Sequence, residues 1–312
     1  MWHNKLHKKN LWSLLCIFIL MNIIAGFHAY KFTHFDRDAS SKTKDARQLS
    51  TAQKLKAILF GISNPRPENK TIPSGDFETI NLQSNKDIAC WMIKVDFAKG
   101  TVILCHGYSG DKASMLDKAA IFRQAGYNTL LVDFMGSGGS EGVQTTIGFL
   151  EAEEVRTTYD YLRGTGETHI ILFGTSMGAA AIMKAQHDYQ LDVNALILEC
   201  PFGTMLKTVQ SRFKSMHIPS FPMDRLLVFW GGALNGFNAF GHNPEDYAQN
   251  IHCPVLLLYG EKDEKVSIQE INTIFSNLAG PKTLQLYPLA GHENYLTQYK
   301  KDWIYDVNTF LH

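Results

Sequence analysis

The pattern of hydrophobic and polar positions changes near residue 76, where short apolar runs begin to alternate with longer mixed stretches. The apolar runs have the length of strands, and the mixed stretches have the length of helices. The predicted strands are 77–83, 88–95, 101–106, 128–134, 169–174, 195–200, 254–260 and 283–288. The predicted helices are 112–125, 149–163, 176–187, 266–278 and 294–311.

The composition of these strands predicts their places in one sheet. The middle strands are almost entirely apolar, as expected when helices cover both faces of a parallel sheet. The first two strands alternate more between apolar and polar residues, which predicts an antiparallel pair at one edge. Strands and helices that alternate at this spacing predict an α/β fold with a doubly wound, mostly parallel sheet.

One segment interrupts the alternation. More than fifty residues separate strands 195–200 and 254–260, which is too many for a simple crossover. This segment is rich in large apolar side chains, and we predict a helical cap insertion at about 203–250. The cap interpretation places these side chains over a pocket. The alternative is a helical insertion whose aromatic residues only pack on the body of the protein.

Residues 1–30 form a different kind of segment. "MWHNKLHKKN" carries three lysines and no acid, and the apolar run 11–27 that follows has no charge. This pattern is typical of a signal anchor or of a cleaved signal peptide. The run is long for a signal peptide, and Phe27-His28-Ala29 lacks the small first residue of a cleavage site, so we favour the anchor. We therefore expect a membrane-anchored protein with the rest of the chain on the exported side; the alternative is a secreted or periplasmic protein.

Residues 31–75 link this segment to the folded domain, which we expect to comprise 76–312. The sequence 31–50 is polar and of mixed charge, which predicts a solvated stalk. The sequence 51–70 predicts a short amphipathic helix that Gly61 and two prolines end.

Composition excludes several classes of function. The formal net charge is zero and the pI is near 7.2, so nothing in the sequence indicates a nucleic-acid partner. The five cysteines have no CxxC spacing and the histidines form no HExxH motif. We expect no disulfide framework and neither a metal nor an organic cofactor.

The sequence "GTSMG", residues 174–178, ends a strand and begins an alanine-rich helix. One interpretation is that Ser176 only caps the helix. The other is a nucleophile elbow, in which a tight strand-to-helix turn exposes the serine hydroxyl. Flanking glycines are then required, because side chains there would clash with the neighbouring strand or helix.

A nucleophilic serine needs a histidine as base and an acid that orients the histidine. Asp263 follows the strand 254–260, and His292 follows the last strand, so the order along the chain is serine, acid, histidine. Each residue also has a structural interpretation, as a turn or surface residue, and Glu264 is an alternative to Asp263. All three residues lie at the carboxyl ends of predicted strands, where open α/β sheets place their sites.

The loop His106-Gly107-Tyr108 supplies a candidate oxyanion hole. The backbone N–H of Tyr108 and that of Met177 can together stabilise a developing oxyanion. We interpret His106 as a structural residue of this loop. The glycine-rich sequence 131–142 does not fit a dinucleotide-binding motif, and we interpret it as a tight loop at the carboxyl edge of the sheet.

The chain from about residue 76 resembles the α/β-hydrolase superfamily. It is most similar to serine hydrolases grouped with serine aminopeptidases, monoacylglycerol lipases and membrane-anchored abhydrolase-domain proteins. The matching sequences are "LCHGYSGD", "VDFMGSGGSEG", "GTSMGAAAIM", "LLLYGEKDEKVS" and "LAGHENY". The resemblance implies Ser176 as nucleophile, Asp263 as acid, His292 as base, and Tyr108 and Met177 as oxyanion donors. Relatives often have arginine where this chain has Met135.

These observations predict a serine hydrolase that cleaves an acyl ester through a Ser-His-Asp triad and an acyl-enzyme. An apolar cap near a membrane anchor favours a small-molecule or lipid-like acyl substrate, including acyl thioesters. The enzymatic alternatives are a serine aminopeptidase-type peptidase and an acyltransferase. A non-catalytic binding protein with the same fold is the alternative from a different class.

Overall fold

The computed structural model describes residues 2–43 and 49–311, and its centre is one eight-stranded sheet. The strand order is β1-β2-β4-β3-β5-β6-β7-β8. β1 and β2 pair antiparallel at one edge, β2 also pairs antiparallel with β4, and the remaining pairs are parallel. This confirms the doubly wound, mostly parallel sheet and its antiparallel edge pair.

The elements follow one another along the chain in the predicted order. The strands are β1 (Glu78–Gln83), β2 (Asp87–Ile93), β3 (Thr101–Cys105), β4 (Asn128–Val132), β5 (Ile170–Thr175), β6 (Ala195–Glu199), β7 (Val255–Gly260) and β8 (Lys282–Tyr287). The α-helices are α1 (Trp2–Thr33), α2 (Thr51–Phe60), α3 (Leu116–Gln124), α4 (Glu151–Gly164), α5 (Met177–Tyr189), α6 (Met205–Met216), α7 (Met223–Asn235), α8 (Pro244–Tyr247), α9 (Ile268–Asn277), α10 (Tyr295–Gln298) and α11 (Lys300–Leu311). Short 3₁₀ helices are η2 (Lys112–Met115), η3 (Ala239–Gly241) and η4 (Ala248–Asn250).

Helices cover both faces of the sheet, and each face has its own hydrophobic core. One core joins the sheet to α4, α5 and α9, and the other joins it to α3 and α11. The middle strands β3, β5, β6 and β7 are buried along almost their whole length. This burial on both faces explains why their sequences are apolar runs without alternation.

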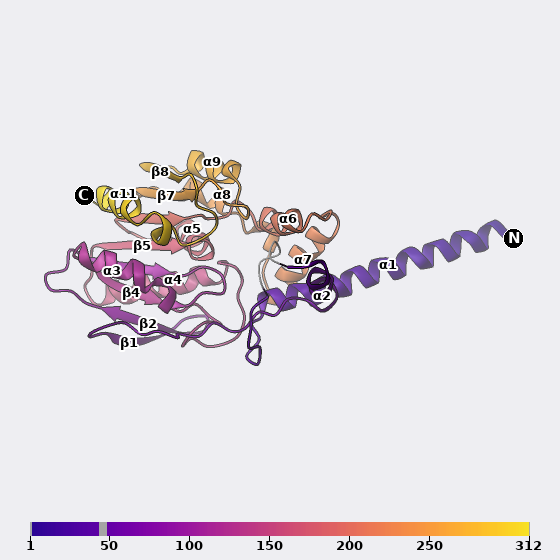
Figure 1. The fold of residues 1–312 in the computed structure, drawn as a ribbon, viewed down its shortest axis with the longest axis horizontal. Coiled ribbons are helices and arrows are strands. Elements are labelled where there is room, and N and C mark those ends of the chain that lie inside the picture. The colour runs from indigo at the N-terminus through magenta and orange to yellow at the C-terminus, as the bar shows by residue number, and fades with distance from the viewer. Residues whose placement is uncertain (1, 44–48, 312) are drawn as a thin grey trace.

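The helix α1 projects from the body of the protein, beside α2 and α7 (Figure 1). Its segment Leu11–Thr33 has 23 residues with a mean hydropathy of 2.0; residues 11–20 are exposed, and Ala25, Ala29 and Thr33 are buried. By length and composition this segment can cross a membrane. The helix α2 begins with a capping box formed by Ser50 and Gln53, and it ends at Gly61, as predicted.

The segment 31–50, expected to be a solvated stalk, contacts the loop after β4 near its start, where the Phe35 N–H donates to the Val143 carbonyl oxygen at 2.6 Å. Residues 44–48 of this segment lie outside the described residues. The polar sequence after α2 is held against the same loop. The Arg66 guanidinium donates hydrogen bonds to the carbonyl groups of Gly138, at 2.8 Å, and of Gly142, at 3.2 Å. The Asn69 side chain donates to the Asp133 carboxylate at 2.7 Å. A polar sequence therefore packs on the body because its side chains find partners there.

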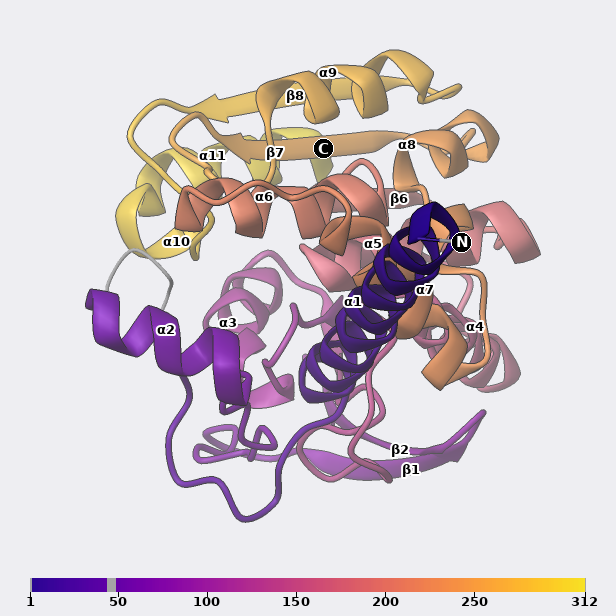
Figure 2. The same cartoon turned by 90° about the vertical axis from the view of Figure 1, so that its right-hand side faces the viewer.

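The insertion between β6 and β7 is helical, as predicted, and its aromatic residues divide into two groups. Phe237 stacks on Phe149 of the body, with ring centroids 4.5 Å apart. Phe221 and Phe229 are 71% and 53% exposed. The helix α7 lies along α1 (Figure 2), so the insertion contacts the N-terminal helix as well as the body.

A buried carboxylate connects the sheet to helices on one side of it. Glu199, the last residue of β6, accepts hydrogen bonds from the Trp303 indole at 2.7 Å and the Thr175 hydroxyl at 2.8 Å. The Lys118 ammonium lies 3.7 Å from this carboxylate and donates to the Asn294 side chain at 2.8 Å. Lys118 and Glu199 are both almost fully buried, so each depends on the other for charge compensation.

We expect Lys118→Met to lower the free energy of unfolding by about 3–5 kcal/mol, because Glu199 then carries an uncompensated buried charge. Denaturant unfolding measures the change. The double variant Lys118→Met/Glu199→Gln should lose less than the sum of the two single variants. Lys94→Met, in the exposed pair with Glu78, is the control and should change stability by less than about 1 kcal/mol. Additive losses in the double variant would contradict this account.

Candidate active site

Ser176 lies in the turn between β5 and α5, with a strained backbone conformation of φ 53° and ψ −107°. Residues other than glycine rarely adopt a positive φ, and such strain is common at functional sites. The Ser176 N–H donates to the carbonyl group of Glu199 at 2.7 Å. The Ser176 side chain makes no capping hydrogen bond to α5. Helix capping therefore does not explain this serine, and its hydroxyl is available for other contacts.

Both glycines of the turn are required by close backbone packing. A Cβ on Gly174 would lie 2.6 Å from the Ala179 nitrogen, in the first turn of α5. A Cβ on Gly178 would lie 2.8 Å from the carbonyl oxygen of His106, in the loop after β3. The helix can approach the strand this closely only without these side chains, as the sequence predicts.

The structure brings Ser176, His292 and Asp263 together at the carboxyl edge of the sheet. The Nε2 atom of His292 lies 3.0 Å from the Ser176 Oγ atom. The Nδ1 atom of His292 lies 2.7 Å from the Asp263 Oδ2 atom. Glu264 is exposed, and the carboxylate that contacts His292 belongs to Asp263. These three side chains come from the loops after β5, β7 and β8.

The Asp263 carboxylate is oriented by the backbone that follows it. Its Oδ1 atom accepts hydrogen bonds from the N–H groups of Lys265, at 2.8 Å, and of Val266, at 3.0 Å. This leaves Oδ2 directed at His292. The side chain is buried, so the hydrogen bond to the imidazole is shielded from water.

Several nearby groups shift the pKa of His292. Burial lowers this pKa, but the sulfur of Cys200 and the carboxylate of Asp263 raise it more, so the pKa lies above the ordinary imidazole value. In the neutral ring, the hydrogen bond to Asp263 favours a proton on Nδ1 and leaves Nε2 as the acceptor toward Ser176. This tautomer is the one that can remove a proton from the serine hydroxyl.

The loop after β3 lies beside Ser176. A Cβ on Gly107 would lie 3.7 Å from the Cβ of Ser176, so the loop backbone passes close to the serine. The next residue is Tyr108, and Met177 is the first residue of α5. Within the described part of the chain, the backbone N–H of neither residue has an acceptor. Both predicted oxyanion donors therefore lie next to Ser176 with unused hydrogen-bonding capacity.

The side chain of Tyr108 connects this loop to the N-terminal segment. Its hydroxyl donates to the carbonyl group of Phe32 at 2.7 Å and accepts from the Asn64 side chain at 2.7 Å. Its ring stacks on Phe32, with centroids 4.7 Å apart. The end of α1 therefore fixes the loop that carries the candidate oxyanion donor. Sequence patterns did not predict this contact.

His106 is structural, as we expected. Its Nε2 accepts a hydrogen bond from the Phe134 N–H at 3.1 Å, and its Nδ1 lies 2.8 Å from the Gly107 carbonyl oxygen. Burial lowers the pKa of His106, which favours the neutral ring that this pair of bonds requires. The glycine-rich loop is tight, also as expected, and its Gly139 N–H donates to Asp133 at 2.7 Å.

Cys200 is the neighbour of the site that sequence reasoning did not identify. It is buried, and its sulfur faces His292 and Asp263. Its position directly after β6, at the carboxyl edge, was the available signal. One ligand atom from each of Cys200, Asp263 and His292 lies within 4.8 Å of the other two. A metal ion held there would occupy the histidine that contacts Ser176 and the carboxylate that contacts this histidine.

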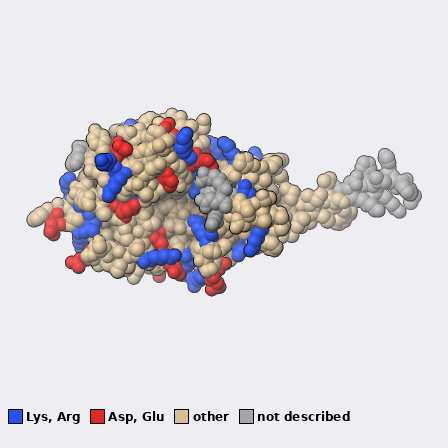
Figure 3. Space-filling view, in the orientation of Figure 1, with Lys and Arg blue, Asp and Glu red and all other residues tan. Residues whose placement is uncertain are grey.

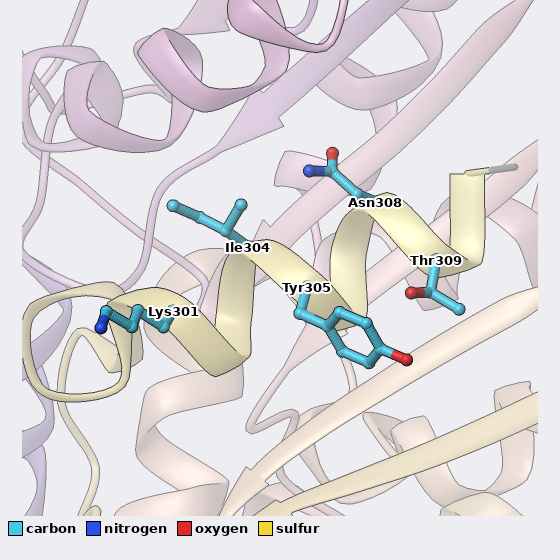
Figure 4. Close-up of a pocket in the computed structure, with 5 residues that line it drawn as sticks. All are labelled: Lys301, Ile304, Tyr305, Asn308 and Thr309. Carbon is cyan, nitrogen blue, oxygen red and sulfur yellow. The ribbon is translucent and has the colours of Figure 1, made fainter.

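On the face seen in Figure 3, basic and acidic side chains are interspersed over the body. The surface also has hollows other than the candidate active site. A groove of about 660 Å³ runs along α11 and is lined by Lys301, Ile304 and Tyr305, among others (Figure 4). None of its lining residues hydrogen-bonds to Ser176, Asp263 or His292. This groove is therefore separate from the candidate active site.

Comparison with known proteins identifies the class. The profile of the family described as serine aminopeptidase, S33, matches residues 96–227. The esterase Pf2001 of Pyrococcus furiosus has the same fold, with a TM-score of 0.65 over 79% of this chain and 97% of that one, at 20% identity. A membrane phospholipase A matches with a TM-score of 0.53 over 75% of this chain and 86% of that one, at 19% identity. The chain therefore has the α/β-hydrolase fold, and its sequence is similar to members of the α/β-hydrolase superfamily.

Its relatives in sequence are distant. The uncharacterised protein YqkD of Bacillus subtilis is 24% identical over 229 residues, which are 72% of this chain and 75% of the relative. The lysophosphatidylserine lipase ABHD12 of Danio rerio is 23% identical over 223 residues, which are 69% of this chain and 56% of the relative. Together with the fold, these matches support a hydrolase.

NMR titration of the imidazole tests the electrostatics of the site. We expect a pKa for His292 above the ordinary value of about 6.5, and a lower pKa in Asp263→Asn, because the negative charge that favours the imidazolium is lost. Cys200→Ala should change the pKa in the same direction. His242 is an internal reference whose pKa is shifted in the opposite direction, because burial lowers it to about 4. An unchanged His292 pKa in both variants would contradict the assignment.

Proposed function

We propose that this protein is a serine hydrolase that cleaves acyl esters of lipid-like substrates. The observation that carries the proposal is the continuous hydrogen-bonded series from Ser176 through His292 to Asp263. A serine hydroxyl is a weak nucleophile until a neighbouring base removes its proton, and this series provides the base and its orienting acid.

In the first half of the reaction, Ser176 Oγ attacks the carbonyl carbon of the ester while His292 Nε2 accepts the hydroxyl proton. Asp263 stabilises the resulting imidazolium through Nδ1. The N–H groups of Tyr108 and Met177 donate to the oxygen of the tetrahedral intermediate. The loss of one such donor typically lowers the rate about 10²–10³-fold.

In the second half, the imidazolium gives its proton to the departing alcohol, and the acyl group remains on Ser176. Water then attacks the acyl-enzyme carbonyl while His292 accepts a proton from the water. Collapse of the second tetrahedral intermediate releases the carboxylic acid and returns the proton to Ser176 Oγ. Every step uses residues of this chain.

The lipid-like character of the substrate is supported by the surroundings of the site. Phe32, near the end of the apolar helix α1, stacks on Tyr108 in the loop beside Ser176. We propose that α1 is a signal anchor, with the lysines at residues 5, 8 and 9 on the cytoplasmic side and the catalytic domain on the exported side. The names of two similar proteins, a lysophosphatidylserine lipase and a membrane phospholipase A, agree with an acyl lipid.

An aminopeptidase is the second candidate, because the matching family profile carries that name. Such an enzyme needs an acidic side chain that binds the free amine of its substrate. Parallel assays with a monoacyl lipid ester and an aminoacyl anilide separate the two functions.

A fluorophosphonate probe tests the nucleophile directly. We expect the full-length protein in detergent or vesicles to be labelled covalently, and Ser176→Ala to lose the label, because the probe reacts only with an activated serine. Ser215→Ala, on the cap helix α6, is the matched control and should be labelled like the wild type. Undiminished labelling of a folded Ser176→Ala variant would exclude Ser176 as the nucleophile.

The role of Asp263 is tested by kinetics with a soluble short-chain ester. We expect Asp263→Asn to lower kcat by about 10³–10⁴-fold, because the imidazole loses both its orientation and its charge partner. Glu264→Gln should stay within about twofold of the wild type. A large loss in Glu264→Gln with a small loss in Asp263→Asn would reverse the assignment.

A further inference from the structure

Two groups of exposed apolar side chains lie on either side of α1. We call them the apolar collar, and most of its members are more than half exposed. The collar comprises Leu55, Ile58, Leu59 and Phe60 of α2, and Phe221, Phe229, Leu234 and Phe240 of the cap. A soluble protein rarely leaves so many large apolar side chains in water on adjoining elements, so this surface calls for an apolar partner.

The collar is continuous with α1 because both of its helices pack on the second half of that helix. The Trp230 indole of α7 donates to the Asn22 side chain at 3.1 Å. A Cβ on Gly26 would lie 3.5 Å from the Trp230 ring, so the two helices are in close contact. On the side of α2, the His28 ring lies 2.8 Å from the Ile58 carbonyl oxygen. Figures 1 and 2 both show α2 and α7 beside this part of α1.

The length of the uncharged sequence indicates how deep in a bilayer these contacts would lie. Residues 10–30 contain no Asp, Glu, Lys or Arg. At about 1.5 Å per residue this stretch is about 31 Å long, which equals the thickness of the hydrocarbon core of a bilayer. If residue 30 lies at the exported boundary, residues 22–26 lie about 6–12 Å below it. The contacts of α7 with Asn22 and Gly26 are therefore inside the span.

We infer that the apolar collar is immersed in the exported leaflet of the bilayer, so that the cap and α2 are lipid-facing parts of the protein. The inference rests on the proposed role of α1 as an anchor. The partner is the acyl-chain region of the phospholipids around α1. The depth of about 5–10 Å typical of interfacial helices agrees with the position of α7 against α1.

The polar residues of α2 fit this position. The charged residues of α2 are Lys54 and Lys56, and it carries no acid. Long basic side chains can extend to the headgroups while their helix buries its apolar face. A groove of about 430 Å³ between α7 and the loop after it is lined mainly by apolar residues, including Phe229, Phe237 and Phe240. An acyl chain of a neighbouring lipid fits the chemistry of this groove.

Immersion of the collar would also explain how a lipid ester reaches Ser176. The ester carbonyl groups of a phospholipid lie at the boundary between headgroups and hydrocarbon. In this protein Phe32, two residues beyond the uncharged stretch, stacks on Tyr108 beside the candidate oxyanion hole. A lipid in the exported leaflet therefore has its scissile bond at nearly the same height as the site.

Photo-crosslinking tests the position of the collar in the full-length protein. The protein is reconstituted in phosphatidylcholine vesicles that contain a phospholipid with a diazirine in its acyl chain, and labelled peptides are identified by mass spectrometry. We expect label on residues 11–24, 55–60 and 221–240. Phe97, which is exposed at the opposite end of the strands, should carry none.

The outcomes separate the inference from the proposals on which it rests. Label on 11–24 without label on 55–60 and 221–240 would overturn immersion and leave the anchor intact. Label absent from all three segments would overturn the anchor and the inference together. Cross-links between two copies of the protein through the collar, with no lipid label there, would identify a dimer surface and would overturn the inference as well.

A kinetic comparison gives a second measurement, independent of labelling. We expect Phe60→Glu and Phe229→Glu to lower hydrolysis of a long-chain acyl ester in vesicles by at least about tenfold, because a buried carboxylate opposes immersion. Hydrolysis of a soluble short-chain ester should stay within about twofold, which shows that the catalytic site is intact. Phe97→Glu is the control and should change neither rate. Equal rates for all three variants in vesicles would contradict the inference.

Discussion

The hydrogen bond from the Ser176 N–H to the Glu199 carbonyl group, at 2.7 Å, is the interaction on which the site depends. A positive φ at a serine is unfavourable by about 1–3 kcal/mol and persists only where the surroundings impose it. Here the bond to β6 and the close approach of α5 to β5 impose it. The Glu199 side chain adds Thr175, Lys118 and Trp303 to the same structural unit. The conformation of Ser176 is thus a consequence of how two central strands and three helices are joined.

The hydrogen bonds around Glu199 extend to the loop that carries His292. A second set of contacts, made by Tyr108, extends to the N-terminal segment. Lys118 bonds to Asn294, two residues after His292, so the buried ion pair connects the loop after β8 to the sheet. Tyr108 connects the loop after β3 to Phe32 at the end of α1. Burial raises the pKa of the Tyr108 phenol, which keeps it a hydrogen-bond donor. The site, the N-terminal helix and the cap therefore form one connected structure.

Much of the fold was predictable because its signals are local. Strands buried on both faces have apolar sequences, edge strands alternate more, and these patterns located all eight strands to within about two residues. The order of Ser176, Asp263 and His292 along the chain was informative for the same reason, since each follows a strand and parallel strands bring their carboxyl ends to one edge. Their assignment to catalytic roles stays a proposal. The sequence by itself determined the sheet, the turn at Ser176 and the apolar character of α1.

The tertiary structure alone decided which distant segments meet. Arg66 binds carbonyl groups more than seventy positions later in the chain, and this makes the polar sequence after α2 part of the body. The position of Cys200 directly after a strand places it at the carboxyl edge, but it faces His292 only because the loops after β6 and β8 converge. Asn22 of α1 and Trp230 of α7 are joined by a hydrogen bond, and the two helices pack closely around it. No local pattern encodes such contacts, because their energy depends on partners that only the folded chain brings together.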